Sequence, residues 1–270
     1  MFFSLILCLN NVNKQFQQKV YLEKGVLLVM IQKFSNFYQF STITSLAAGN
    51  FDGMIKLGTL LKQGNFGLGT FDHLDGELIV LDGVGYQLKS DGTVNEVTAS
   101  MTSPFAVMAF FEEHQKINIS QLTSYEEIQQ VIVDNLPSLN LFYGIKINGL
   151  FSEIKTRTVS WQEKPYPTLL KASEQQGILN AKNINGDIVG FWTPSFANTL
   201  GVNGFHCHFI NTEKNTGGHI FDFQLDSGTI EICYFSKINL ELPTNKEYLE
   251  TNLMAFELQN EIELAENAKK

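Results

Sequence analysis

Residues 204–223 read GFHCHFINTEKNTGGHIFDF and hold three of the five histidines in this chain of 270 residues. Apolar residues flank the polar, glycine-ended segment NTEKNTGG, a pattern that predicts two strands joined by a turn. Because successive side chains of a strand point to opposite faces, we expect His206 and His208 to project to one side, about 7 Å apart. The turn folds the chain back and places His219 beside them.

This arrangement of histidines predicts a metal centre. Three neutral imidazoles around one divalent cation leave coordination positions open, as in catalytic zinc sites, whereas a structural site needs a fourth protein ligand. We therefore expect His206, His208 and His219 to bind one cation. Cys207 alternates with the first two histidines, so its side chain is expected on the opposite face, in the core.

Other interpretations of the histidines are weaker. A cupin barrel also uses His-x-His followed by a glutamate and a later histidine, and Glu213 stands near the place of that glutamate. Glu213 lies inside the polar turn, however, and the glycine spacing and the second cupin motif are missing, so the cupin barrel is kept only as a structural alternative. His73 and His114 lie among acidic residues, where solvated or hydrogen-bonded histidines are expected.

The composition is that of a soluble globular protein, with 44% hydrophobic and 17% charged residues. A net charge of −9 argues against nucleic acid as a partner, since phosphate binding needs clustered basic residues. The three cysteines show no C-x-x-C spacing, so neither a disulfide framework nor a thiolate zinc site is indicated. A reducing compartment fits this cysteine usage best.

One arginine, Arg157, stands among eighteen lysines. One interpretation is that an AT-rich coding sequence avoids arginine codons and that this residue survives by chance. The functional interpretation is that the position needs a planar fork of donors, which lysine does not offer to a carboxylate or an enediolate.

The N-terminus carries a short apolar run, MFFSLILCLNN, without a positive region before it or a small-x-small cleavage site after it. Residues 25–31 are too few to cross a membrane. We expect a cytoplasmic protein without a membrane partner; export through a poorly formed signal is the alternative. The recognisable patterning starts near residue 36, so residues 1–29 are either an extension or a misassigned start.

Strand patterns separated by D-G, N-G, G-G and S-G turn pairs dominate the chain. Helical patterns occupy residues 42–48, 56–63 and 123–136, and residues 247–268 predict a mostly helical tail. The expected fold is α+β and sheet-rich, with mixed or antiparallel sheets in two subdomains flanked by helices. We assign residues 1–35 to an extension, 36–170 to an N-terminal α+β subdomain, and 171–270 to a β-rich subdomain that carries the metal site and the tail.

Six segments, in their order and at their separations, resemble the α-acetolactate decarboxylase family. The resemblance covers about residues 36–235 closely and the tail loosely, and it is specific because LDGE, RTV followed by PYP, GFWTP, and GFHCHF with GGH occur together. The segments are TITSLAAGNFDG, GNFGLGTFDHLDGELIVLDGVGYQL, SPFAV, IKTRTVSWQEKPYP, GDIVGFWTP and GFHCHFINTEKNTGGHIFDF.

The resemblance implies a soluble, usually homodimeric, zinc-dependent enzyme that converts 2-acetolactate to (R)-acetoin and carbon dioxide. It implies that the three histidines bind the metal and that Glu77 of LDGE, Arg157 of KTRTV and Glu266 of LAEN are catalytic. The tail departs from the family pattern, so neighbouring glutamates remain alternatives to Glu266: Glu257, Glu261 and Glu263.

The implied chemistry agrees with these residue types. Loss of carbon dioxide from a 3-oxo acid leaves an enediolate, whose charge a dication stabilises as a Lewis acid. Arg157 would grip the carboxylate with two donors, and a protonated glutamate would deliver a proton to one face. The alternative function is a non-catalytic metal-binding or small-ligand-sensing protein, which would need the histidines but neither Glu77 nor a proton donor in the tail.

Overall fold

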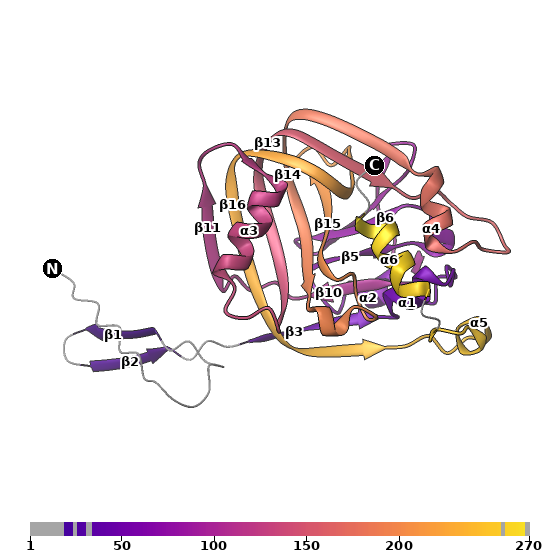
Figure 1. Cartoon of the computed structure of the whole chain (residues 1–270), viewed down its shortest axis with the longest axis horizontal. Coiled ribbons are helices and arrows are strands. Elements are labelled where there is room, and N and C mark those ends of the chain that lie inside the picture. The colour runs from indigo at the N-terminus through magenta and orange to yellow at the C-terminus, as the bar shows by residue number, and fades with distance from the viewer. Residues whose placement is uncertain (1–18, 24–25, 31–33, 255–256, 268–270) are drawn as a thin grey trace. The chain divides into compact units, whose positions relative to one another are not determined.

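The computed structural model describes residues 19–23, 26–30, 34–254 and 257–267 (Figure 1). The chain forms two compact units, residues 1–34 and residues 35–270. In the first, β1 (Lys19–Glu23) pairs antiparallel with β2 (Val26–Met30). The apolar run at residues 1–11, which includes Cys8, lies outside the described residues. Within the described residues, no helix is long and apolar enough to cross a membrane.

The second unit is built around one mixed sheet of twelve strands, which confirms the expected sheet-rich α+β class. A further pair of short strands lies beside it. The strands are β3 (Ser35–Phe40), β4 (Ile55–Lys56), β5 (Phe66–Thr70), β6 (Glu77–Leu81), β7 (Val84–Leu88), β8 (Val94–Glu96), β9 (Thr102–Ser103), β10 (Ala106–Ala109), β11 (Gln115–Ile119), β12 (Thr123–Ser124), β13 (Phe142–Thr158), β14 (Gly177–Thr193), β15 (Gly204–Asn211) and β16 (Gly217–Glu241).

Helices are short and few among the described residues. Those labelled α1, α4 and α6 contact one another at one flank of the sheet, whereas α3 packs against β12 and β16 (Figure 1). The helices are α1 (Ile43–Ala47), α2 (Leu57–Leu60), α3 (Tyr125–Asn135), α4 (Leu169–Ala172), α5 (Lys246–Glu250) and α6 (Glu257–Asn267), with 3-10 turns η1 (Asp72–Leu74), η2 (Ser173–Gln175) and η3 (Ser195–Ala197).

Four strands form a closed circuit within the sheet. β13 pairs with β14 and β16, and β15 also pairs with both. The last residues of β16, 235–241, pair in parallel with β3, which leads through β10 and β5 to β6. The sheet therefore contains strands from both sides of the expected boundary at residues 170 and 171, and the division into two subdomains stays a prediction.

A cluster of phenylalanines fills the core between these parts. Phe37 of β3 packs against Phe235 of β16 with ring centroids 5.3 Å apart, and Phe66 of β5 packs against Phe191 of β14 at 5.5 Å. All four side chains are buried. Burial of aromatic area is worth more per residue than that of smaller side chains, so this cluster is a main apolar contact between the β13–β16 circuit and the strands that follow β3.

The turn between β6 and β7 shows how local residues fix the strand register. Asp82 and Gly83 form the two-residue connection, and both have positive φ angles, 51° and 85°. Such turns match the twist of the paired strands, and the Asp-Gly pair tolerates the left-handed conformation. The D-G signal in the sequence therefore indicated a hairpin correctly.

Two helix predictions need correction in their extent. The helix expected at residues 56–63 is only α2, because Lys56 pairs in β4 and the chain tightens after Leu60, where the N–H groups of Lys62 and Gln63 donate to carbonyls three residues back. The tail is helical in two pieces, α5 and α6, separated by residues 251–254 and by two residues outside the described set.

Helix α3 begins with a capping box, which makes its N-terminus testable. The Ser124 hydroxyl accepts from the Glu127 N–H, and the Glu127 carboxylate accepts from the Ser124 N–H at 2.8 Å. We expect Ser124→Ala to lower the free energy of unfolding by about 1 kcal/mol, because an N–H of the first helical turn loses its acceptor. Urea unfolding measures this change. Ser120→Ala, an exposed serine outside the helix, is the control, and equal effects of the two substitutions would contradict the prediction.

Candidate active site

Three neighbouring strands place a row of site residues on one face of the sheet. His219 of β16 lies opposite Arg157 of β13 and also opposite His208 of β15. Side chains of directly opposite residues share a face, so all three point to the same side. His206 joins them because it lies two residues before His208 on the same strand. The hairpin expected from the sequence is therefore present as β15 and β16. Arg157 lies in β13, which pairs with the other edge of β16.

Glycines at the start of β16 allow this close packing. A Cβ atom on Gly217 would lie 2.2 Å from the carbonyl oxygen of Phe209, and one on Gly218 would lie 2.6 Å from that of Arg157. Any side chain at either position would push the neighbouring backbone away. The Gly-Gly pair before His219 is thus required by the approach of β15 and β13.

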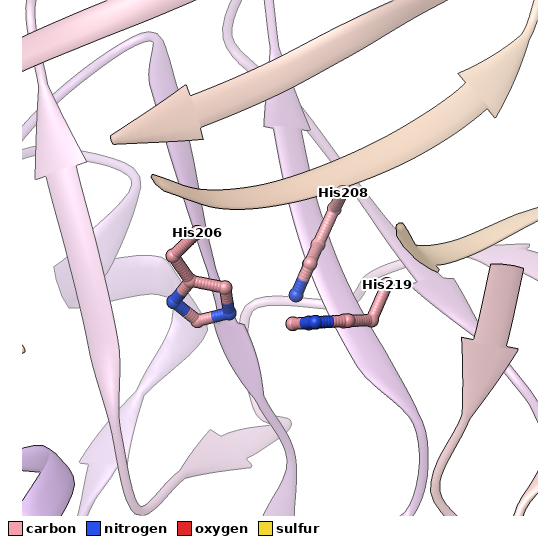
Figure 2. A group of neighbouring side chains, drawn as sticks. All are labelled: His206, His208 and His219. Atoms are coloured by element: carbon pink, nitrogen blue, oxygen red, sulfur yellow. The ribbon is translucent and has the colours of Figure 1, made fainter. Parts of the chain in front are cut away.

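The three histidine side chains converge (Figure 2). One ring nitrogen from each lies within 4.8 Å of those of the other two, and the ring centroids are 5.1 to 5.5 Å apart. His206, His208 and His219 are all buried, with exposed fractions of 8%, 0% and 4%. Three nitrogens so close together and shielded from water leave room for one small cation between them.

The protonation state of the imidazoles suits metal binding. Burial, assisted by the positive charge of Arg157, lowers the pKa of His206 to about 3. Burial and the neighbouring His206 lower that of His208 to about 3, and the pKa of His219 also lies well below its usual value, mainly through burial. The rings are therefore neutral near pH 7, and neutral imidazole is the form that binds metal ions.

His208 is oriented by a backbone partner from the other part of the sheet. Its Nδ1 lies 2.8 Å from the carbonyl oxygen of Leu78 in β6. Since a carbonyl only accepts, Nδ1 carries the proton and Nε2 keeps its lone pair. That Nε2 atom is buried without a hydrogen-bond partner. A buried acceptor without a partner, aimed at two other imidazoles, fits a divalent cation.

Helix α6 supplies a carboxylate to the same point. The Glu266 Oε2 atom lies 3.6 Å from His219 Nδ1, 4.0 Å from His206 Nε2 and 3.1 Å from Arg157 Nη2. Contacts of α6 with α1 and α4 hold this helix over the site. The structure thus brings Glu266 to the cluster, whereas the side chain of Glu263 is exposed.

Arg157 is buried, with an exposed fraction of 4%. Its Nη1 donates to the Gln176 side-chain oxygen at 3.1 Å and its Nη2 to Glu266 at 3.1 Å. The guanidinium carbon lies 5.2 Å from the centroid of the Phe221 ring. The side chain is therefore held by an amide, a carboxylate and an aromatic face.

Glu77 is the first residue of β6 and approaches the cluster from that strand. Its Oε2 lies 3.6 Å from His208 Nε2, and the residue is buried, with an exposed fraction of 7%. Burial raises the pKa of Glu77 to about 8, opposed by the charge of Arg157 and reinforced by that of Glu266. This carboxyl group therefore carries a proton near pH 7.

Four of the site residues, Glu77, Arg157, His206 and Glu266, line one small cavity of about 20 Å³, room for about one water molecule. Its polar wall contains charged and titratable side chains, and its other wall is apolar. An apolar, closed surrounding strengthens every electrostatic interaction inside. The lining residues are Leu46, Gly69, Thr70, Leu74, Glu77, Phe105, Arg157, Val159, Leu169, His206 and Glu266.

The remaining histidines are used elsewhere, as hydrogen-bonded residues. His73 stacks on Trp161 and lies 2.9 Å from the Tyr166 hydroxyl, and His114 stacks on Tyr234. Glu213, the residue that the cupin alternative would use, accepts a hydrogen bond from the Asn211 amide in the turn.

Two partners of the site were not found by sequence reasoning. The Leu78 carbonyl is a backbone group and leaves no signature in a sequence. Gln176 stands in the polar run SEQQG, where Ser173, Glu174 and Gln175 are equally able to accept a hydrogen bond from an arginine. Only the pairing of β13 with β14 reveals that this glutamine lies next to Arg157.

Comparisons with known proteins agree on one family. The model of the α-acetolactate decarboxylase family matches residues 37–255. The α-acetolactate decarboxylase of Bacillus subtilis is 43% identical over 237 residues, 88% of this chain and 93% of that protein, and that of Methanosarcina mazei is 38% identical over 229 residues, 85% and 79% of the two chains.

Solved structures give the same result. The crystal structure of the Bacillus subtilis enzyme superposes with a TM-score of 0.85 at 43% identity, covering 87% of this chain and all of that one. A Staphylococcus aureus protein described as similar to α-acetolactate decarboxylase gives 0.82 at 32% identity, covering 86% of this chain. This chain belongs to the α-acetolactate decarboxylase family.

Proposed function

We propose that this protein decarboxylates 2-acetolactate to (R)-acetoin and carbon dioxide, with zinc as its metal. One observation carries the proposal: three neutral imidazoles, the chain's single arginine and two glutamates converge at one buried point, and four of these six residues line a small cavity there. The names of the relatives support decarboxylation of acetolactate, whereas zinc and the (R) configuration of the product are part of the proposal. A homodimer and a cytoplasmic location stay predictions.

His206, His208 and His219 would hold the zinc ion. Imidazole nitrogen suits zinc, and three protein ligands leave positions for substrate oxygens. When bound, the ion supplies Lewis-acid stabilisation of negative charge that develops on the substrate. The carbonyl of Leu78 fixes the tautomer of His208, so that ligand is already oriented before any metal arrives.

Arg157 would bind the carboxylate that leaves as carbon dioxide. It lines the cavity, and its planar donors match the geometry of a carboxylate. Because the residue is buried, its charge is weakly screened and acts strongly on an anion in the cavity. After loss of carbon dioxide, the same charge would stabilise the enediolate.

Glu77 is the better candidate for the proton that completes acetoin. It is buried against His208, and burial keeps its carboxyl group protonated near pH 7. The sequence pointed instead to the tail glutamate as the donor. Glu266 forms a buried ion pair with Arg157, so we assign it the role of holding the guanidinium and facing the metal ligands.

The metal requirement is the first test. Purified protein should form acetoin from racemic 2-acetolactate, lose this activity with a chelator, and regain it with zinc, because the imidazoles alone cannot stabilise the developing charge. An acetoin colour assay measures turnover, and native mass spectrometry should find about one metal per chain. If the protein binds metal but shows no turnover at any zinc concentration, it is a sensor rather than an enzyme and the proposal is wrong.

The role of the arginine fork is tested by Arg157→Lys. The substitution keeps the charge but removes one of two paired donors, each worth about 1.5–3 kcal/mol to a charged acceptor, so kcat/KM should fall roughly 10- to 100-fold. Steady-state kinetics measure the change. Lys182→Arg, on the exposed side of β14, is the matched control and should behave as wild type. Near-normal turnover of Arg157→Lys would show that the fork is not needed.

The proton donor is tested by Glu77→Gln. The amide has the same shape but no transferable acidic proton, so kcat should fall by about 10²- to 10⁴-fold while bound zinc stays constant. Chiral chromatography of the residual product should show loss of preference for one acetoin enantiomer. Glu96→Gln at the exposed edge of β8 is the control. A variant with normal kcat and pure (R)-product would exclude Glu77 as the donor.

A further inference from the structure

The guanidinium of Arg157 has three donor nitrogens, and only two of them have a hydrogen-bond partner. Its Nη1 donates to Gln176 and its Nη2 to Glu266, each at 3.1 Å, whereas Nε is buried without a hydrogen-bond partner. A buried donor without an acceptor is costly in a resting protein and marks the place where a ligand oxygen belongs.

The covalent geometry of arginine shows which edge of the guanidinium carries the donor without a partner. Nε and Nη2 lie on one edge of the planar group, and Nη1 lies on the other side of the central carbon. Arg157 lines the cavity, and Gln176 is not among the residues that do so. Gln176 therefore lies behind the guanidinium. On the Nε–Nη2 edge, Nε has no partner and Nη2 has a second N–H besides the one that Glu266 accepts, so this edge is the one that can bind an anion in the cavity.

We propose that Gln176 is a positioning residue that holds Nη1 so that the Nε–Nη2 edge of Arg157 faces the substrate carboxylate. The inference rests on the proposed function for the identity of that anion. Gln176 itself does not touch the substrate; it acts through Arg157.

The pairing of β13 with β14 explains why the side chain of Gln176 can reach Arg157. Arg157 of β13 pairs with Ile178 of β14, and Gln176 lies two residues before Ile178, just before the strand begins. The Phe221 ring restrains the guanidinium from one side but offers no hydrogen-bond acceptor that would stop rotation within its plane. An acceptor at Gln176 stops that rotation.

The absence of charge on the Gln176 side chain is part of its proposed role. Glu266 already pairs with Arg157 in a site where charges are poorly screened. A second carboxylate behind the guanidinium would offset the positive charge that attracts an anionic substrate. An amide oxygen fixes the same N–H without this electrostatic cost.

The chain's single arginine allows a direct spectroscopic test. In nitrogen-15 spectra of the full-length protein, every arginine side-chain signal comes from Arg157. We expect two separate Nη signals at low temperature in wild type, because both groups are held. In Gln176→Leu these signals should merge through rotation and the Nε signal should shift. Gln176→Glu, which keeps an acceptor, should retain two signals.

The matched control is Gln130→Leu, an exposed glutamine of α3 that donates to Asp134. It should leave all Arg157 signals unchanged. If Gln176→Leu also leaves them unchanged in folded protein, Gln176 does not position the arginine and the inference is wrong, whatever the enzyme's substrate.

Kinetics then separate orientation from charge. Gln176→Leu should raise KM for 2-acetolactate roughly 10- to 100-fold, the loss expected when a hydrogen bond to a charged group is removed. Gln176→Glu should raise KM for the anionic substrate while inhibition by neutral acetoin stays constant. Equal changes in KM and in acetoin inhibition would indicate general damage and contradict the inference. A wild-type protein inactive on 2-acetolactate would refute the proposed function alone, because the spectra still test Gln176.

Discussion

The site depends on a single backbone register, in which His219 lies opposite both Arg157 and His208. A shift of β16 by one residue against either neighbour would turn its side chains to the other face of the sheet. His219 would then point away from His206 and His208, and the metal cluster would not form. The Gly-Gly pair before His219 protects this register, since any larger residue there would collide with the backbones of β13 and β15. Strand pairing and chemistry are thus specified by the same few residues.

Burial sets the protonation state of the site. The same exclusion of water that lowers the pKa of the histidines raises that of Glu77, because in each case it disfavours the charged form. Arg157 supplies the positive charge of the site, and Glu266 and Gln176 accept its hydrogen bonds. Burial therefore keeps the histidine ligands neutral and the Glu77 carboxyl group protonated.

The sequence predicts the parts of the site that are local. His206, His208 and His219 fall within fourteen residues, and strand alternation with one turn is enough to bring them together. Arg157 was conspicuous as the only arginine, but its place beside His219 follows from a pairing between distant strands. Glu77 reaches His208 only because β6 meets β15, and the N-terminus of α2 is fixed by N–H groups that donate to Ala99 and Met101. Such long-range contacts, like that of Gln176, cannot be derived from periodicity or turn signals.

The parallel pairing of β16 with β3 also bears on how the protein acquires its structure. It joins positions about two hundred residues apart in the chain, a separation typical of high contact order and slow folding. The edge of β3 that pairs with β16 stays unpaired until the C-terminal part of the chain has folded, and an exposed strand edge can pair with other chains. High-level expression should therefore be limited by aggregation during folding, which favours slow synthesis at low temperature.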